Sequence, residues 1–287
     1  MDTAKAIGII IANPEFEDVR SLEGVAPTKN PCVPIIAVPT TAGTAAEVTI
    51  NYVITDVEKK RKFVCVDSHD MPVIAVVDPE MMLTIPAHLT AYQGFDALFH
   101  ATEGYIANVA TPLSDAYALK SIELLAKYLP AAVKDGSDLE ARTQVALAST
   151  LSGMVESTSS CLSEHSLEHA LSAYHPDLPH GAGLIMISQA YYTHFAQAHA
   201  CDSRLIDMAR ALGKKDATHP MDFVIALVQL QVACGVDNLK MSDYGIRRED
   251  LPVMAKNARD TMGDLFLLDP IALSEEDCIA IYEQSYR

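Results

Sequence analysis

Two histidine-containing segments carry the side chains best suited to binding a metal ion. In the first, GFDALFHATEGY, Asp96 and His100 are four residues apart, so a helix would present a carboxylate and an imidazole from one face, one turn apart. An isolated pair of this kind is more often an ordinary pair on a helix surface than part of a metal site. The pair therefore becomes informative only together with a second cluster.

The second cluster is the segment EHSLEHALSAYHPDLPHGAG. It holds four of the chain's ten histidines within sixteen positions: His165 and His169 at i, i+4, then His175, and His180 before Gly181. Capping or core histidines that bond to carbonyl groups are the alternative interpretation. Imidazoles with one carboxylate suit Fe²⁺, Zn²⁺ or Ni²⁺ and bind Ca²⁺ or Mg²⁺ poorly. The residue types thus favour a transition metal without choosing among these three.

A run of small and polar residues, PTTAGTAAEVT at 39–49, is a candidate ligand-binding turn between an apolar strand and the start of a short helix. Thr40, Thr41 and Thr44 could offer hydroxyl and backbone N–H groups to a phosphate or a ribose. A strand-to-helix connection capped by threonine explains the run equally well. The chain has neither a GxGxxG nor a Walker sequence. Lys62, in the basic run KKRK, could pair with an anionic cofactor, although such a run is more often a solvated turn.

The elements that must position these residues differ between the two parts of the chain. A helical pattern opens the chain at 2–13, and four β-rich runs follow: PIIAVPTT, NYVITD, KRKFVCVD and PVIAVVDPE. After about residue 86 long segments have apolar residues at helical spacing, for example at 89–108, 113–134, 138–160, 181–199, 203–212 and 220–235. We therefore predict a small α/β region followed by an all-helical domain.

Composition limits the class of protein and its partners. With 287 residues, 49% of them hydrophobic and 21% charged, two globular domains are expected. The net charge of −17 disfavours nucleic acid and anionic membranes as partners. Six scattered cysteines are typical of reduced thiols, and the chain has neither a long apolar run nor a signal-peptide pattern. We expect a cytoplasmic soluble protein.

Four segments together resemble the iron-containing alcohol dehydrogenase family. They are PIIAVPTTAGTAAEVTINYVITD, the DPE of 78–80, GFDALFHATEGY and EHSLEHALSAYHPDLPHGAG, and the resemblance runs from Asp2 to the C-terminal SYR. It implies the dehydroquinate synthase-like fold of that family. In this chain the expected parts are an incomplete dinucleotide-binding α/β domain at 1–86 and a helical, metal-binding catalytic domain at 87–287.

The resemblance also implies the activity and the residues that carry it. The expected activity is NAD(P)-linked oxidation of a primary alcohol or small diol, or reduction of the aldehyde, with Fe²⁺, Zn²⁺ or another divalent transition metal as Lewis acid. The expected assembly is a homodimer or higher homo-oligomer. The implied metal ligands are Asp96, His100, His165 and His180, with His169 beside the metal to assist binding or proton transfer. Dinucleotide contacts are implied for Thr40, Thr41, Thr44, Asn51 and Lys62, whereas His175 matches no family residue.

The departure from the family pattern is at the N-terminus. Family members carry GGGS just before the opening helix, whereas this sequence begins with Met1 and Asp2. About a hundred residues of the nucleotide-binding unit are thus expected to be missing, which predicts weak cofactor binding and poor turnover. Two alternatives stay open: a catalytically silent remnant that binds metal, and a metal-dependent hydrolase that activates water.

Overall fold

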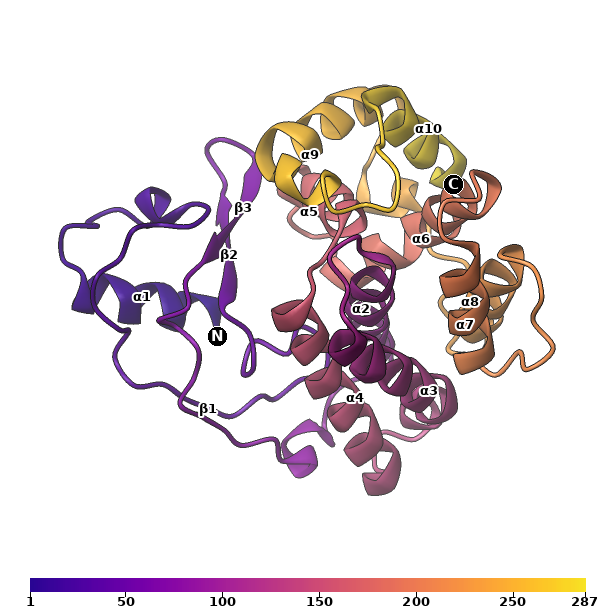
Figure 1. The fold of residues 1–287 in the computed structure, drawn as a ribbon, viewed down its shortest axis with the longest axis horizontal. Helices are drawn as coiled ribbons and strands as arrows, with labels where there is room; N and C mark the ends of the chain where they lie inside the picture. Colours follow the sequence, from indigo (N-terminus) through magenta and orange to yellow (C-terminus); the bar gives the residue numbers. More distant parts are fainter.

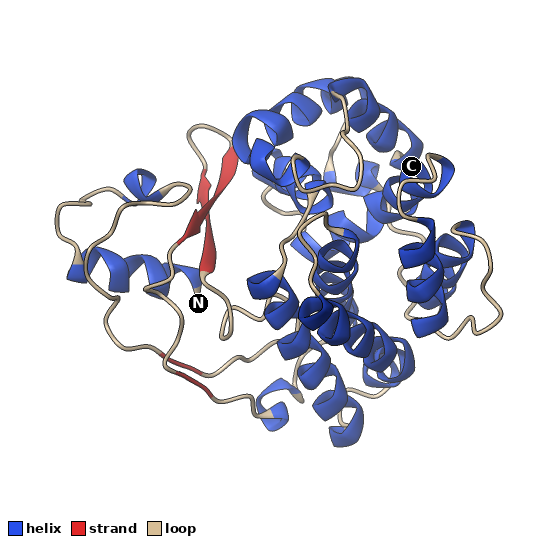
Figure 2. Cartoon of the chain, in the orientation of Figure 1, coloured by secondary structure: helices blue, strands red, loops and turns tan.

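The secondary structure changes character at residue 86. A computed structural model describes all 287 residues. All the strands precede residue 76, and every α-helix except the first begins after residue 86 (Figures 1 and 2). The predicted order, α/β first and all-helical second, is confirmed. The domain limits 1–86 and 87–287 stay a prediction, because Ala42 and Met82 belong to the same hydrophobic core as the helices.

A helix and a hairpin form the ordered centre of the first part. Helix α1 (Asp2–Ala12) packs against the hairpin of β2 (Asn51–Asp56) and β3 (Arg61–Val66), which pair antiparallel. Side chains alternate between the two faces of the hairpin. One face joins a small core of apolar residues: Ala6, Ile9, Leu22, Tyr52, Phe63 and Cys65. The opposite face is turned toward the helical part of the chain (Figure 1).

The other two predicted strands are much shorter than expected. Within these two runs only β1 (Ile36–Ala37) and β4 (Ile74–Ala75) form a ladder, and they pair in parallel. Ile36 and Ile74 remain 63% and 51% exposed. A strand is stabilised mainly by packing of its faces, and of these four residues only Ala37 is buried, so the ladder does not extend.

The prediction that a short helix begins in 39–49 is wrong. These residues form turns without a helix, and Ala45 has a positive φ of 51°. A residue in the left-handed region interrupts helical geometry. The β-branched Thr44, Val48, Thr49 and Ile50 also lose side-chain freedom in a helix, which disfavours one here.

The helical part is built around α2 (Ala87–Ile106). Every residue of 94–106 is buried, because α2 packs against α3 (Pro112–Lys134), α4 (Leu139–Thr158), α6 (His180–Gln197) and α7 (Asp202–Ala211). The other helices are α5 (Ser163–Tyr174), α8 (Met221–Ala233), α9 (Leu251–Phe266) and α10 (Glu275–Ser285). None of the helices combines the length and apolar character needed to cross a bilayer. Polar side chains on α2 therefore lie inside the core, where each needs a partner.

Local sequence fixes where the central helices start. The side chain of Thr111 caps α3 in a reciprocal pair with Ser114, and Pro112 occupies the first turn. Asp138 caps α4 by accepting a hydrogen bond from the amide of Ala141. These caps set where α3 and α4, the two helices with the most contacts to α2, begin.

Candidate active site

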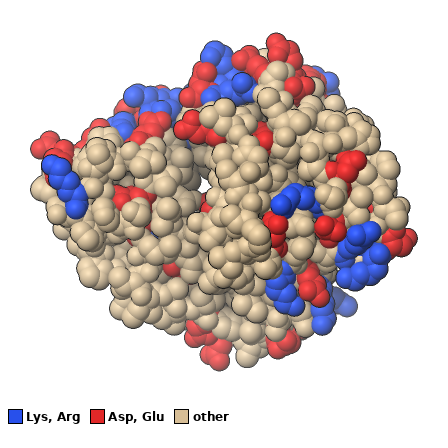
Figure 3. Space-filling view, in the orientation of Figure 1, with Lys and Arg blue, Asp and Glu red and all other residues tan.

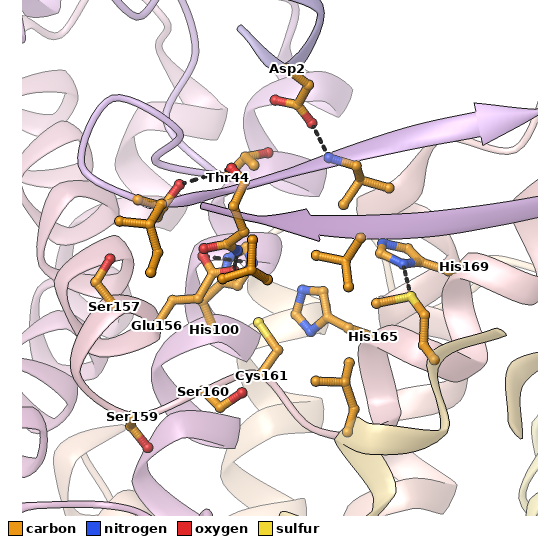
Figure 4. A pocket seen from close by; sticks show the side chains of 18 of the residues that line it. Asp2, Thr44, His100, Glu156, Ser157, Ser159, Ser160, Cys161, His165 and His169 are labelled. Carbon is orange, nitrogen blue, oxygen red and sulfur yellow. Dashed lines mark hydrogen bonds and ion pairs between the residues drawn. The ribbon is translucent and has the colours of Figure 1, made fainter. Parts of the chain in front are cut away.

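A cavity of about 260 Å³ separates the hairpin from the helices. Figure 3 shows the surface hollowed between these two parts of the chain. The hairpin contributes one face of β2 and β3, and the opposite wall comes from α2, α4, α5, α6 and α9. Figure 4 shows the imidazoles of His100, His165 and His169 directed into this space. His180 completes the histidine cluster.

Asp96 lies at the centre of three imidazoles. Its Oδ1 is 3.4 Å from His180 Nε2, 3.5 Å from His165 Nε2 and 3.6 Å from His100 Nδ1. Asp96 Oδ1, His165 Nε2 and His100 Nδ1 are buried and have no hydrogen-bond partner. Buried polar atoms without partners are costly, so their convergence indicates a site built for a bound group.

The spacing of these donor atoms fits a metal ion. Ligands about 2.1 Å from a tetrahedral ion lie about 3.4 Å from one another. The donor atoms of Asp96, His165 and His180 all lie within 4.8 Å of one another. His100 belongs to a second, overlapping set with Cys161 and His165, and its Nε2 lies 3.8 Å from Glu156. The structure thus gathers the four predicted ligands, with His100 at the edge of the group.

Helix geometry explains how distant segments meet here. Asp96, His100 and Glu103 share one face of α2 at i, i+4 and i+7. His165 is in the first turn of α5, and His180 is the first residue of α6 after Pro179. The N-terminal ends of α5 and α6 thus meet near Asp96 on α2. Neither of these two ends has a side-chain cap.

Two buried carboxylates hold the imidazoles from behind. Glu103 Oε1 accepts a hydrogen bond from His165 Nδ1 at 2.6 Å, and its other oxygen accepts from the backbone N–H of Leu162. Glu168 makes the equivalent contact with His180 Nδ1. A carboxylate on Nδ1 fixes the tautomer, so that Nε2 is left to bind a metal. Burial lowers the pKa of His165, but Glu103 and Asp96 outweigh it and raise that pKa well above its ordinary value.

Burial and charge also compete on Asp96 and His180. Burial raises the pKa of Asp96, but the surrounding imidazoles outweigh it and hold that pKa well below its ordinary value. Burial lowers the pKa of His180, but Glu168 and Asp96 more than offset this and raise it to about 9. A metal ion must therefore displace protons as it binds, and its affinity falls as the pH falls.

His169 lies beside this group on α5. Its Nδ1 is 2.9 Å from Met262 Sδ on α9, and its ring centroid is 5.0 Å from that of His180. Burial, followed by the charges of His180 and Lys62, holds the pKa of His169 well below its ordinary value. The imidazole is thus neutral.

Of the five residues predicted to contact a dinucleotide, Thr41, Thr44 and Asn51 line cavities. Thr44 lines the main cavity and donates a hydrogen bond to Asp96 Oδ2 at 3.2 Å. Thr41 and Thr44 also line a neighbouring cavity of about 160 Å³. Thr40 lines neither cavity and is exposed. Asn51 lines the main cavity, whereas Lys62 lies on the same face of β3 as Val64 but outside the lining.

Sequence reasoning missed four polar residues of the site. Glu103 and Glu168 support the imidazoles, and Glu156 and Cys161 line the cavity. The spacing of Glu103 after Asp96 and His100 was a usable signal, because all three fall on one helix face. Glu156 and Cys161 carry no such signal, since they lie at the end of α4 and in the connection to α5.

Gly181 lets α6 start directly against the backbone of α2. A Cβ at this position would overlap the carbonyl group of Tyr92, which is backbone and cannot turn away. We expect Gly181→Ala to push α6 and His180 away from Asp96 and to lower the free energy of unfolding by about 3 kcal/mol. Chemical denaturation measures this change.

The matched control for this prediction is Gly263→Ala in α9. A Cβ there would meet nothing within 4 Å, and alanine favours a helix over glycine by up to about 1 kcal/mol. Gly263→Ala should therefore be neutral or stabilising. Equal stability of the two variants would contradict the close approach of α6 to α2.

Comparison with known proteins covers nearly the whole chain. Residues 1–79 match the family model "Iron-containing alcohol dehydrogenase", and residues 90–286 match "Fe-containing alcohol dehydrogenase family, C-terminal". Lactaldehyde reductase of Escherichia coli K12 is 42% identical over 99% of this chain and 74% of its own length. For 1,3-propanediol dehydrogenase of Klebsiella pneumoniae the identity is 35% over 99% of this chain and 73% of its own. The solved structure of an alcohol dehydrogenase from Oenococcus oeni superposes with a TM-score of 0.92, at 33% identity, over 99% of this chain and 74% of its own.

Proposed function

The chain belongs to the iron-containing alcohol dehydrogenase family, and we propose that it oxidises a small primary alcohol or diol with NAD(P)⁺, or reduces the corresponding aldehyde. Its relatives include lactaldehyde reductase and 1,3-propanediol dehydrogenase. The observation that carries the proposal is the convergence of three imidazole nitrogens on one unpartnered oxygen of Asp96 beside a cavity. Such a donor set suits a metal that polarises an alcohol.

We assign Asp96, His100, His165 and His180 as the metal ligands. Their donor set suits Fe²⁺, which is our proposal for the resident ion, and also Zn²⁺. When bound, the metal supplies a Lewis acid for the alcohol oxygen, and NAD(P)⁺ supplies the acceptor for the hydride. Thr44 donates to Asp96 Oδ2, which leaves Oδ1 directed toward the imidazoles.

His169 is the residue proposed to move the proton. With a proton on Nδ1 directed to the sulfur of Met262, its Nε2 can accept the hydroxyl proton of the alcohol, directly or through water. Burial keeps the imidazole neutral, as this role requires. His175, at the C-terminal end of α5, does not line the cavity and has no role in the proposal.

We propose that the dinucleotide lies along the hairpin side of the cavity. Thr40, Thr41, Thr44, Asn51 and Lys62 are its proposed contacts, by resemblance to the family. The two adjoining cavities and the position of Lys62 on the cavity-facing side of β3 support this path. Titration with NAD⁺ and NADP⁺ measures the affinity of this site for each dinucleotide.

The assembly and location proposed for the protein are a homodimer or higher homo-oligomer in the cytoplasm. The exposed apolar side chains of Ile36 and Ile74 support association. The six free cysteines fit a reducing compartment.

An anaerobic assay tests the activity. Protein loaded with Fe²⁺ or Zn²⁺ should form NAD(P)H when given 1,2-propanediol, 1,3-propanediol or propan-1-ol. A chelator should abolish the rate, and added metal should restore it. Esters and phosphoesters, which test the hydrolase alternative, should not be turned over. Metal-loaded protein that forms no NAD(P)H from any alcohol would reject the proposed function.

A further inference from the structure

The cavity is acidic at the end where α4 finishes. Among the residues that line it are two carboxylates, Asp2 and Glu156, but neither lysine nor arginine. Asp2 accepts a hydrogen bond from the backbone N–H of Val53 at 2.9 Å, so its charge is partly satisfied. Glu156 lies among Ser157, Cys161 and His100 (Figure 4). Its side chain is only 11% exposed, so its charge acts mainly inside the cavity.

Glu156 is held in place by one contact and faces the metal ligands with the other oxygen. The side-chain amide of Asn51 donates a hydrogen bond to Oε1. Oε2 lies 3.8 Å from His100 Nε2, which is too far for a hydrogen bond. A carboxylate is therefore fixed beside His100, one of the proposed metal ligands, and no lysine or arginine forms an ion pair with it.

Neither Lys5 nor Lys62, the two lysines near the cavity, forms an ion pair with Glu156. Lys5 lies on α1 behind β2, where its ammonium donates to the carbonyl oxygens of Thr49 at 2.5 Å and Asn51 at 3.0 Å. It also lies 3.8 Å from Asp70. Lys62 lies toward His169, whose pKa it lowers. Positive charge is thus found at the His169 end of the cavity, and negative charge at the Glu156 end.

We propose that Glu156 selects substrates that carry an ammonium group, so that the preferred substrate class is small amino alcohols and the corresponding amino aldehydes. The inference rests on the proposed alcohol dehydrogenase function. In the oxidation, the carbinol carbon passes hydride to NAD(P)⁺ and the hydroxyl proton passes to His169 and then to solvent, while the ammonium stays unchanged against the Glu156 carboxylate. An ammonium in contact with the Glu156 carboxylate is attracted strongly, because the site is partly desolvated. A carboxylate or sulfonate in the same place is repelled.

Three alcohols with matched skeletons test the charge preference: 3-aminopropan-1-ol, butan-1-ol and 3-hydroxypropanoate. Their kcat/KM values are compared at pH 7.5 in metal-loaded wild type and Glu156→Gln, which keeps the shape and removes the charge. Wild type should prefer the amino alcohol to butan-1-ol by about tenfold or more, with the hydroxy acid poorest. In Glu156→Gln this preference should fall by about tenfold. Glu123→Gln removes the same charge from the exposed surface of α3 and should keep the wild-type ratios.

A second measurement separates this inference from the proposed function. The shift in melting temperature caused by each alcohol, in metal-loaded protein without cofactor, reports binding independently of turnover. The amino alcohol should give the larger shift in wild type, and Glu156→Gln should abolish the difference. If wild type and Glu156→Gln prefer the amino alcohol to butan-1-ol equally, the inference is overturned and the dehydrogenase function stands. Direct binding of the amine to the metal would give this result. Charge-dependent binding without NAD(P)H formation from any alcohol would support the role of Glu156 and reject the proposed function.

Discussion

The His165→Ala variant should lose its bound metal, most of its activity and much of its thermal stability together. Two sets of candidate metal donors include His165: Asp96 with His180, and His100 with Cys161. The side chain of His165 is buried, since the residue is only 3% exposed. Removing it opens the coordination shell and leaves the fully buried Glu103 without its imidazole partner. We expect kcat to fall by about a thousandfold or more, because the Lewis acid is lost with the ligand.

The stability change has two separable parts. A metal present at about a thousand times its Kd stabilises the folded state by about 4 kcal/mol, and this contribution disappears with the metal. Breaking a buried charged pair costs about 3–5 kcal/mol more. A chelator should therefore lower the melting temperature of wild type but leave that of His165→Ala unchanged, and the variant should remain the less stable of the two metal-free proteins.

His175→Ala is the matched control for this experiment. His175 ends α5, lies outside the cavity and is partly exposed, so its removal deletes an imidazole from the same segment without touching the site. It should keep its metal, its activity and its response to the chelator. Elemental analysis of purified proteins measures the metal content. The same metal content in wild type and His165→Ala would exclude His165 as a ligand.

The helices and the candidate ligands could be predicted because their signals are local. The predicted helix at 113–134 corresponds to α3 at Pro112–Lys134, where apolar spacing, a capping residue and a proline agree. Asp96 with His100, and His165 with His169, are four residues apart, a spacing that helix geometry turns into a shared face.

Contacts between distant segments could not be predicted from such patterns. The pair Glu103–His165 spans 62 residues of chain, and Asn51–Glu156 spans 105. Spacing within a helix says which residues share a face but not which other helix that face meets. Thr44 illustrates the limit: its polar turn indicated a possible phosphate or ribose contact, which stays a prediction, but gave no sign of its hydrogen bond to Asp96, 52 residues away.

The prediction of strand length failed in two of the four runs for a related reason. PIIAVPTT and PVIAVVDPE have the β-branched content of strands, yet only Ile36–Ala37 and Ile74–Ala75 pair. Strand propensity describes a side chain that fits a half-buried, pleated surface. The hairpin strand β2 has such a surface against α1, and there the predicted run NYVITD matches Asn51–Asp56 in full.

Glu168→Gln should weaken metal binding by about 10- to 100-fold at high pH and should also change the proton balance of binding. Glu168 is fully buried on α5 and contacts Nδ1 of His180. Glutamine keeps the size of the side chain and an oxygen that can accept the same hydrogen bond. The substitution therefore removes the charge while preserving the orientation of the imidazole.

The pH dependence follows from the charge on His180 before metal binds. Burial lowers its pKa, but Glu168 and Asp96 raise it to about 9, so below pH 9 the metal-free site holds a proton on His180 that the metal must displace. Without the charge of Glu168, that pKa should fall toward the ordinary value of about 6.5. Between pH 7 and 9 the variant should then release about one proton fewer per metal bound, and its loss of affinity should be larger at pH 9 than at pH 7.

Calorimetric titration with Zn²⁺ in buffers of different ionisation enthalpy measures both the affinity and the number of protons released. Glu123→Gln, which removes an exposed charge from α3, should match wild type in both quantities. If Glu168 only positions His180, the variant should keep wild-type affinity and proton release at every pH, because glutamine preserves the hydrogen bond. If the charge of Glu168 sets the basicity of His180, both quantities change together. A loss of positioning alone would not change the number of protons released.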